Sequence, residues 1–136
     1  MRIRVKAEIE QLENINQALD ALLQEQPCAE ETRTQIYLCV EELFVNIASY
    51  AYEDTVGMAE IEMHIEKGVL SVTFYDWGVP YNPLEKEPPD LLADAEDRQI
   101  GGLGIYMVRC MMDQVEYERK ENQNCLRIRK KLNESS

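Results

Sequence analysis

Glu42, Asn46 and Tyr50 recur every four residues, which places them on one face of a predicted helix. Asparagine is a poor helix former, and its amide demands several hydrogen-bond partners when buried. The amide oxygen of Asn46 can ligate Mg²⁺, and a carboxylate one turn earlier, Glu42, can accept a proton from an attacking hydroxyl or water. The alternative is a solvated glutamate beside a locally bonded asparagine. The adjacent Glu41 projects about 100° away around the helix.

A second candidate group lies at the end of a predicted strand, where Asp76 is followed two residues later by Gly78. Such a pair can simply cap a turn. Alternatively, a buried carboxylate at this position can accept a hydrogen bond from an exocyclic amine such as that of adenine. Gly78 would then let the ring approach the backbone closely. The pattern alone leaves both interpretations open.

Three glycines, Gly101, Gly102 and Gly104, stand at the start of a predicted helix. Each glycine inside a helix costs about 1 kcal/mol relative to alanine. A plain loop-to-helix turn explains one glycine but not three. The free N–H groups of a helix start bind phosphate, so this segment favours a phosphate site. It is neither a P-loop nor a dinucleotide motif, because the residues that follow do not match either pattern.

Hydrophobic periodicity predicts the elements that position these groups. We expect strands at residues 2–8, 59–66, 69–75, 113–119 and 125–132, with turns at 67–68 and 122–124. Helices are expected at residues 14–26, from about 30 to 53, and from 101 onward. Residues 81–100 are proline-rich and irregular, and so long a segment in a small domain is often a functional lid. The order predicts one domain, residues 1–136, of the α+β class: a two-layer α/β sandwich with helices on one face of a mixed, largely antiparallel sheet.

The composition limits the partners. The chain has 26 Asp and Glu against 14 Lys and Arg, a formal net charge of −12, which disfavours direct contact with nucleic acid or an anionic membrane. It has no signal peptide and no apolar run of the roughly 20 residues that span a bilayer, so we expect a cytoplasmic protein. The four cysteines form no CxxC pair, and we expect reduced, mostly buried thiols. The single His64 cannot build a metal cluster with cysteines so scattered.

Together the segments 41–52, 75–83 and 101–117 resemble the N, G1 and G2 boxes of the GHKL ATPase and kinase superfamily. Within it, the chain is most similar to the anti-sigma factor serine kinases of bacterial partner-switching systems. The resemblance covers nearly the whole chain and implies the GHKL (histidine-kinase-like ATPase) fold, with ATP and Mg²⁺ as cofactors. It implies Asn46 as the Mg²⁺ ligand and Glu42 as the general base. The implied nucleotide-binding residues are Asn46, Tyr50, Asp76, Gly78, Gly101, Gly102, Leu103 and Gly104.

The resemblance also implies what such a domain acts on. By this resemblance residues 84–100 are the ATP lid. The implied phosphorylation target is a serine on a STAS-type antagonist protein, and the implied binding partner is a sigma factor or other regulator. A homodimer is also possible by this resemblance. Two alternatives stay open: a non-catalytic module that binds nucleotide and sequesters a partner, and a slow ATPase without a protein substrate. Glu42 favours catalysis, since nucleotide binding alone does not require it.

Overall fold

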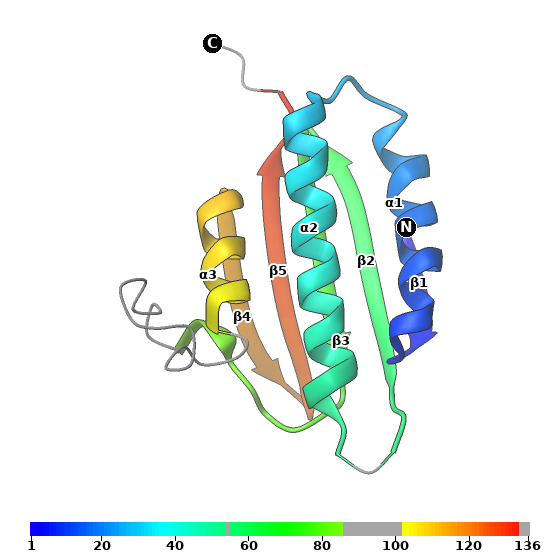
Figure 1. The fold of residues 1–136 in the computed structure, drawn as a ribbon, viewed down its shortest axis with the longest axis vertical. Helices are drawn as coiled ribbons and strands as arrows, with labels where there is room; N and C mark the ends of the chain where they lie inside the picture. The colour runs from blue at the N-terminus through cyan, green and yellow to red at the C-terminus, as the bar shows by residue number, and fades with distance from the viewer. Residues whose placement is uncertain (54, 86–101, 134–136) are drawn as a thin grey trace.

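The computed structural model describes residues 1–53, 55–85 and 102–133, which form a sheet covered on one face by helices (Figure 1). The strands are β1 (Arg2–Lys6), β2 (Met58–Glu66), β3 (Val69–Asp76), β4 (Gln114–Lys120) and β5 (Gln123–Lys131). The helices are α1 (Leu12–Leu23), α2 (Glu30–Asn46) and α3 (Gly102–Met111), with short 3-10 turns at Ile9–Gln11 and Pro83–Glu85. The predicted lid lies outside the described residues from residue 86 onward.

The sheet has the strand order β1-β2-β3-β5-β4, and every pairing among the described strands is antiparallel. The predicted α+β sandwich is therefore confirmed. The sheet, which the prediction allowed to be mixed, is antiparallel throughout these strands. Lys67 and Gly68 join β2 to β3 with φ angles of 53° and 76°, the left-handed geometry that a two-residue hairpin turn requires.

The helix-side face of the sheet forms the core, because alternate residues of each strand point toward the helices. In β2 and β3 these are Ala59, Ile61, Met63, Leu70, Val72 and Phe74. They meet the apolar sides of α1 and α2, contributed by Ile15, Leu19, Leu22, Leu23, Ile36, Cys39, Val40, Leu43 and Phe44. The Lys130 Nζ of β5 donates to the carbonyl of Met111 at 2.7 Å, which stabilises the C-terminal end of α3 and ties that helix to the sheet.

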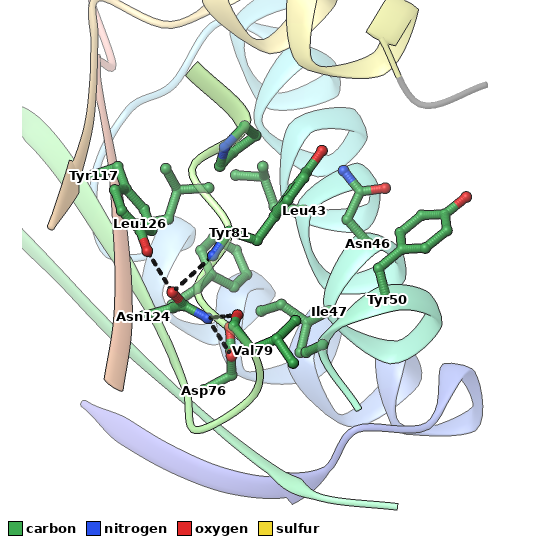
Figure 2. A pocket seen from close by; sticks show the side chains of 13 residues that line it. Leu43, Asn46, Ile47, Tyr50, Asp76, Val79, Tyr81, Tyr117, Asn124 and Leu126 are labelled. Atoms are coloured by element: carbon green, nitrogen blue, oxygen red, sulfur yellow. Dashed lines mark hydrogen bonds between the residues drawn. The ribbon is translucent and has the colours of Figure 1, made fainter. Parts of the chain in front are cut away.

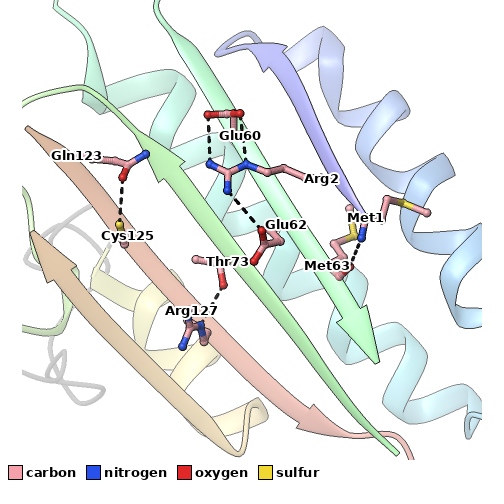
Figure 3. A network of polar contacts seen from close by, with 9 residues as sticks. All are labelled: Met1, Arg2, Glu60, Glu62, Met63, Thr73, Gln123, Cys125 and Arg127. Carbon is pink, nitrogen blue, oxygen red and sulfur yellow. Dashed lines mark hydrogen bonds and ion pairs between the residues drawn. The ribbon is translucent and has the colours of Figure 1, made fainter. Parts of the chain in front are cut away.

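The opposite face of the sheet carries charged side chains that pair across neighbouring strands (Figure 3). The guanidinium of Arg2 lies 3.3 Å from the carboxylate of Glu60 and 3.4 Å from that of Glu62, and it stacks 4.4 Å from the centre of the Tyr75 ring. Arg127 donates to the Thr73 hydroxyl at 3.0 Å. Cross-strand pairs of this kind stabilise a sheet without any ligand, so the candidate chemistry lies on the helix side.

Two boundaries differ from the prediction in ways that matter for the site. The second helix is regular only to Asn46 and continues as a π-helix, Ile47–Ala51, which changes the direction of the residues after Asn46. The last strand begins at Gln123 rather than Cys125, because its pairing with β3 extends to the Asp76–Asn124 pair. Asn124, which we expected in a turn, therefore lies in β5.

The cysteine prediction was only half right. All four cysteines are free thiols, but only Cys39 is buried; Cys28 and Cys125 are half-buried and Cys110 is exposed on α3. Cys110 lies on the solvent side of a short amphipathic helix, whose buried side includes Ile105 and Val108. Among the described residues, no helix combines the length and the apolarity that crossing a membrane requires.

Candidate functional site

A pocket opens between the C-terminal part of α2 and the ends of β3 and β5 (Figure 2). It holds about 490 Å³ of empty space, counting the part open to solvent. Its apolar walls are Leu43, Ile47, Ala51, Phe74, Val79, Pro83 and Leu126. Its polar groups are Asn46, Tyr50, Asp76, Tyr81, Tyr117 and Asn124. Three of the predicted site residues, Asn46, Tyr50 and Asp76, therefore meet in one cavity.

Asp76 is a buried carboxylate at the floor of this pocket. It continues the helix-side alternation of β3 and is only 6% exposed. Its Oδ1 accepts hydrogen bonds of 2.9 Å from the Gly78 N–H and from Asn124 Nδ2. Burial raises the pKa of Asp76, and these two hydrogen bonds and the nearby Arg119 oppose that rise. The hydrogen bonds from described residues all reach Oδ1, so Oδ2 is available to a ligand.

Gly78 lies behind the pocket, packed on the end of the π-helix. A Cβ at Gly78 would lie 2.1 Å from the carbonyl oxygen of Ala51, a distance that no side chain can occupy. The next residue, Val79, donates its N–H to that same oxygen at 3.1 Å. The glycine is therefore required by this backbone contact, a reason that sequence reasoning did not find. Whether a nucleobase also approaches Gly78 stays a prediction.

Asn46 and Tyr50 form the helix side of the pocket, across from Asp76 and Asn124 in Figure 2. Asn46 is the last residue of α2 and is half-buried, and its amide makes no hydrogen bond to any described residue. Tyr50 lies in the π-helix with 52% of its surface exposed. An amide oxygen beside a pocket, with no hydrogen bond from the part of the chain that the structure describes, suits a Mg²⁺ ligand.

Glu42 does not line the pocket but contacts the first turn of α3. A Cβ at Gly104 would lie 1.8 Å from Glu42 Oε1 and 2.3 Å from its Cδ, so the carboxylate rests directly on the glycine. Because Glu42 is one turn before Asn46, this contact joins the polar face of α2 to the start of α3. The two motifs were predicted separately, and the structure brings them together.

The remaining residues of the glycine segment are only partly described. Gly102 and Leu103 begin α3, as the sequence predicted for the helix start, and Gly101 lies outside the described residues. The first N–H groups of a helix have no partner within the helix, which suits an anion, and Gly104 in this first turn lies against Glu42. Among the described residues there is no group of three His, Cys, Asp or Glu that could hold a metal ion unaided.

Sequence reasoning missed Asn124, which bridges Asp76 to the loop after β3. Its Nδ2 donates to Asp76 Oδ1 at 2.9 Å and to the Val79 carbonyl at 2.8 Å. Its Oδ1 accepts from the Tyr117 hydroxyl and, at 3.4 Å, from the Tyr81 N–H. The available signal was the strand alternation through Leu126 and Ile128, which places Asn124 on the same buried face.

The fold and the pocket define a histidine-kinase-like domain. The histidine kinase domain of the blue-light activated histidine kinase EL346 from Erythrobacter litoralis has this fold, with a TM-score of 0.55 and 23% identity over 75% of this chain and 45% of that one. The Histidine kinase-like ATPase domain family matches residues 5–130, and the chain belongs to this family.

Curated relatives are protein kinases by name. The chain is 28% identical over 97 residues to the serine/threonine-protein kinase BtrW of Bordetella bronchiseptica, covering 71% of this chain and 68% of that protein. It is 27% identical over 93 residues to the serine-protein kinase RsbW of Bacillus thuringiensis, covering 65% of this chain and 58% of that protein. The match therefore spans less than two thirds of RsbW.

Proposed function

We propose that this chain binds ATP with Mg²⁺ and transfers the γ-phosphoryl group to a serine of a STAS-type antagonist protein, while it also sequesters a regulator such as a sigma factor. The observation that carries the proposal is the contact between Glu42 and Gly104. This contact brings a carboxylate to the helix start that suits a phosphate, which nucleotide binding alone would not need. Membership of the ATPase family and the kinase names of the relatives support the same reading.

In this proposal the pocket holds the base and the start of α3 holds the phosphates. Adenine lies against the apolar walls, and its exocyclic amine donates to Asp76 Oδ2. Asn46 would supply an amide oxygen to Mg²⁺, and the ion would neutralise charge on the phosphates. Gly101, Gly102, Leu103 and Gly104 supply backbone N–H groups, and residues 84–100 form the lid. The residue roles follow the family resemblance, and the geometry of Asp76 and Glu42 fits them.

The chemical step is a displacement at phosphorus. The acceptor serine oxygen forms a bond to the γ-phosphorus as the bond to the β,γ-bridging oxygen breaks, and ADP leaves. Glu42 accepts the proton of the serine hydroxyl. Phosphoryl transfer depends on positioning and charge neutralisation more than on covalent chemistry, which suits a site with so few reactive groups. The acidic chain fits a partner with a basic contact surface, and a cytoplasmic location and a homodimer are compatible with this role.

The test is transfer of labelled phosphate from ATP, with Mg²⁺, to a purified STAS-type protein. Glu42→Gln removes the base and keeps the side-chain shape, and we expect it to abolish transfer while ATP still binds. Glu41→Gln is the matched control, because Glu41 is exposed and projects from another face of the same helix. We expect this control to transfer at the wild-type rate.

Each other outcome identifies a competing function. Tight nucleotide binding without transfer would support the binding module, and release of phosphate without labelling of the protein would support the slow ATPase. Failure of the wild-type chain to bind ATP would overturn all three.

A further inference from the structure

Asn124 is almost completely buried at the point where β5, β3 and the loop after β3 meet. It is 6% exposed and stands directly opposite Asp76 in the β3–β5 pairing, with Arg119 opposite it on β4. Asparagine is rare in strand interiors, because its amide has four hydrogen-bonding sites to satisfy. Here all four are used, two as donors and two as acceptors. Asn124 therefore has no hydrogen-bonding site left for a ligand.

The orientation of the Asn124 amide is determined by its neighbours. The groups next to Nδ2 are the Asp76 carboxylate and the Val79 carbonyl, which can only accept hydrogen bonds. A flipped amide would bring its oxygen against both acceptors. The Tyr81 N–H, on the other side, can only donate, which requires an oxygen there. The NH₂ group of Asn124 therefore always faces Asp76.

This arrangement restricts how Asp76 can meet a ligand. Oδ1 already accepts from Asn124 and from the Gly78 N–H, so the carboxylate cannot rotate without losing one of these bonds. Oδ2, which accepts no hydrogen bond from the described residues, is left as the acceptor for a ligand in the pocket that Asp76 lines. The same amide also holds Val79, a wall residue of the pocket, through its carbonyl. One side chain thus fixes both the acceptor and the wall beside it.

We propose that Asn124 is a positioning residue for nucleobase selection: it holds Asp76 so that Oδ2 alone accepts a hydrogen bond from the exocyclic amine of the base. This inference rests on the proposed ATP site and adds the residue on which its selectivity depends. Recognition of the base then depends on one charged acceptor held in one direction. A base with a carbonyl in place of the amine would bring two acceptors together and be rejected.

The readout is the preference for ATP over inosine triphosphate, measured by calorimetry. Inosine triphosphate carries a carbonyl where ATP carries the amine. A hydrogen bond to a charged acceptor implies a preference on the order of 10–100-fold in the wild-type chain. In Asn124→Leu we expect this preference to fall to about twofold or less, mainly through weaker ATP binding. The matched control is Asn133→Leu, which removes a 2.8 Å hydrogen bond to the Pro27 carbonyl far from the pocket and should leave the preference unchanged.

The pH dependence separates positioning from a merely structural role. Burial already raises the pKa of Asp76, and Asn124 opposes that rise by donating to the ionised form. Without this donor the pKa rises further, so the remaining ATP affinity of Asn124→Leu should fall at a higher pH than that of wild type as the solution is acidified. Asn124→Asp, which is nearly isosteric, should behave in the opposite way: its ATP preference should return as pH falls, because a shared proton between the two carboxylates restores a donor to Asp76.

The other titratable groups near Asp76 do not reproduce these opposite trends. Burial raises the pKa values of Tyr52, Tyr117 and Cys125, so these groups stay neutral across the acidic range in which the trends are measured. Asp76 and the group introduced at position 124 are then the described groups that titrate in this environment.

The outcomes distinguish this inference from the proposed function. Loss of preference in Asn124→Leu, with opposite pH trends in the two variants, supports it. ATP binding with the wild-type preference in both variants would overturn the role of Asn124 and leave the ATP site intact. No ATP binding by the wild-type chain would overturn both. If Asn124→Leu does not fold, as judged by its thermal melt, the Asn124→Asp trend and a reduced preference in Tyr117→Phe, which removes one donor to Asn124, decide the question.

Discussion

The contact between Glu42 and Gly104 predicts that Gly104→Ala separates stability from activity. The new Cβ would start 1.8 Å from Glu42 Oε1, whereas ordinary contacts of a Cβ are 3.4 Å or longer. The difference, 3.4 minus 1.8, requires a displacement of about 1.6 Å. The carboxylate is the flexible end of a side chain, so it moves and the helices do not. A misplacement of about 1 Å in a reacting group can cost roughly 100-fold in rate, so we expect at least that loss of phosphoryl transfer.

The same change should not destabilise the fold. Alanine is favoured over glycine inside a helix by about 1 kcal/mol, and moving the end of a glutamate side chain to another rotamer costs a comparable amount at most. We therefore expect a melting temperature equal to or above that of the wild-type chain. Loss of activity in a protein that is no less stable would show that the change acts at the site and not through the stability of the fold.

Gly68→Ala should have the opposite effect, lowering stability while leaving activity unchanged. Gly68 has a φ of +76°, and a Cβ added there would have no atom within 4 Å, so alanine at this position is strained but meets no steric contact. The left-handed conformation costs roughly 1–2 kcal/mol for a residue with a side chain. We expect lower stability with unchanged transfer, measured by chemical denaturation and by the labelled-phosphate assay. Wild-type transfer by Gly104→Ala would refute the reasoning about Glu42.

Two further changes test the pocket floor and the loop beside it. Asp76→Asn should weaken ATP binding by about 1–3 kcal/mol in calorimetry, because the amide cannot replace the charged acceptor. Burial raises the pKa of Asp76, so folding disfavours its ionised form, and the variant should be at least as stable as wild type at neutral pH. This advantage in stability should disappear as the pH falls through the raised pKa of Asp76. Tyr52→Phe removes a hydroxyl that donates to the Met58 carbonyl at 2.6 Å and accepts from the backbone N–H of Trp77 at 2.9 Å. The change should lower the free energy of unfolding by about 1–3 kcal/mol, measured by urea denaturation followed through the fluorescence of Trp77, the only tryptophan. An unchanged denaturation midpoint would contradict this prediction.

The sequence predicted the order and type of the elements because their hydrophobic patterns are long and regular. Alternation through Ile61 and Met63, and again through Val72 and Phe74, identified the central strands and their buried face. The same reasoning failed at Asn124, where Asn122 and its neighbours indicate a turn and the strand pairing decides otherwise. The pairing of β5 with β3 joins residues 48 positions apart, and such pairing is not encoded by local composition.

The candidate site was predictable as residues but not as contacts. Asp76 and the glycines stand out by type and position, whereas their partners do not. Nothing local to Ala51 indicates that Gly78 packs on its carbonyl, and nothing local to Asn124 indicates that it holds Asp76. The π-helix that brings Ala51 to this position also has no distinctive sequence pattern.

These contacts change how substitutions at the two glycines must be interpreted. Gly78 and Gly104 were selected in the sequence because a ligand could approach them, yet each already makes a close contact within the chain, with Ala51 and with Glu42. Loss of activity on substituting either glycine therefore cannot by itself assign a ligand contact. A double-mutant cycle resolves this for Gly104. If alanine at position 104 acts only by displacing Glu42, Gly104→Ala should cost little further activity in a chain that already carries Glu42→Gln. If Gly104 instead contacts the phosphate directly, Gly104→Ala should lower ATP affinity both in the wild-type chain and in Glu42→Gln.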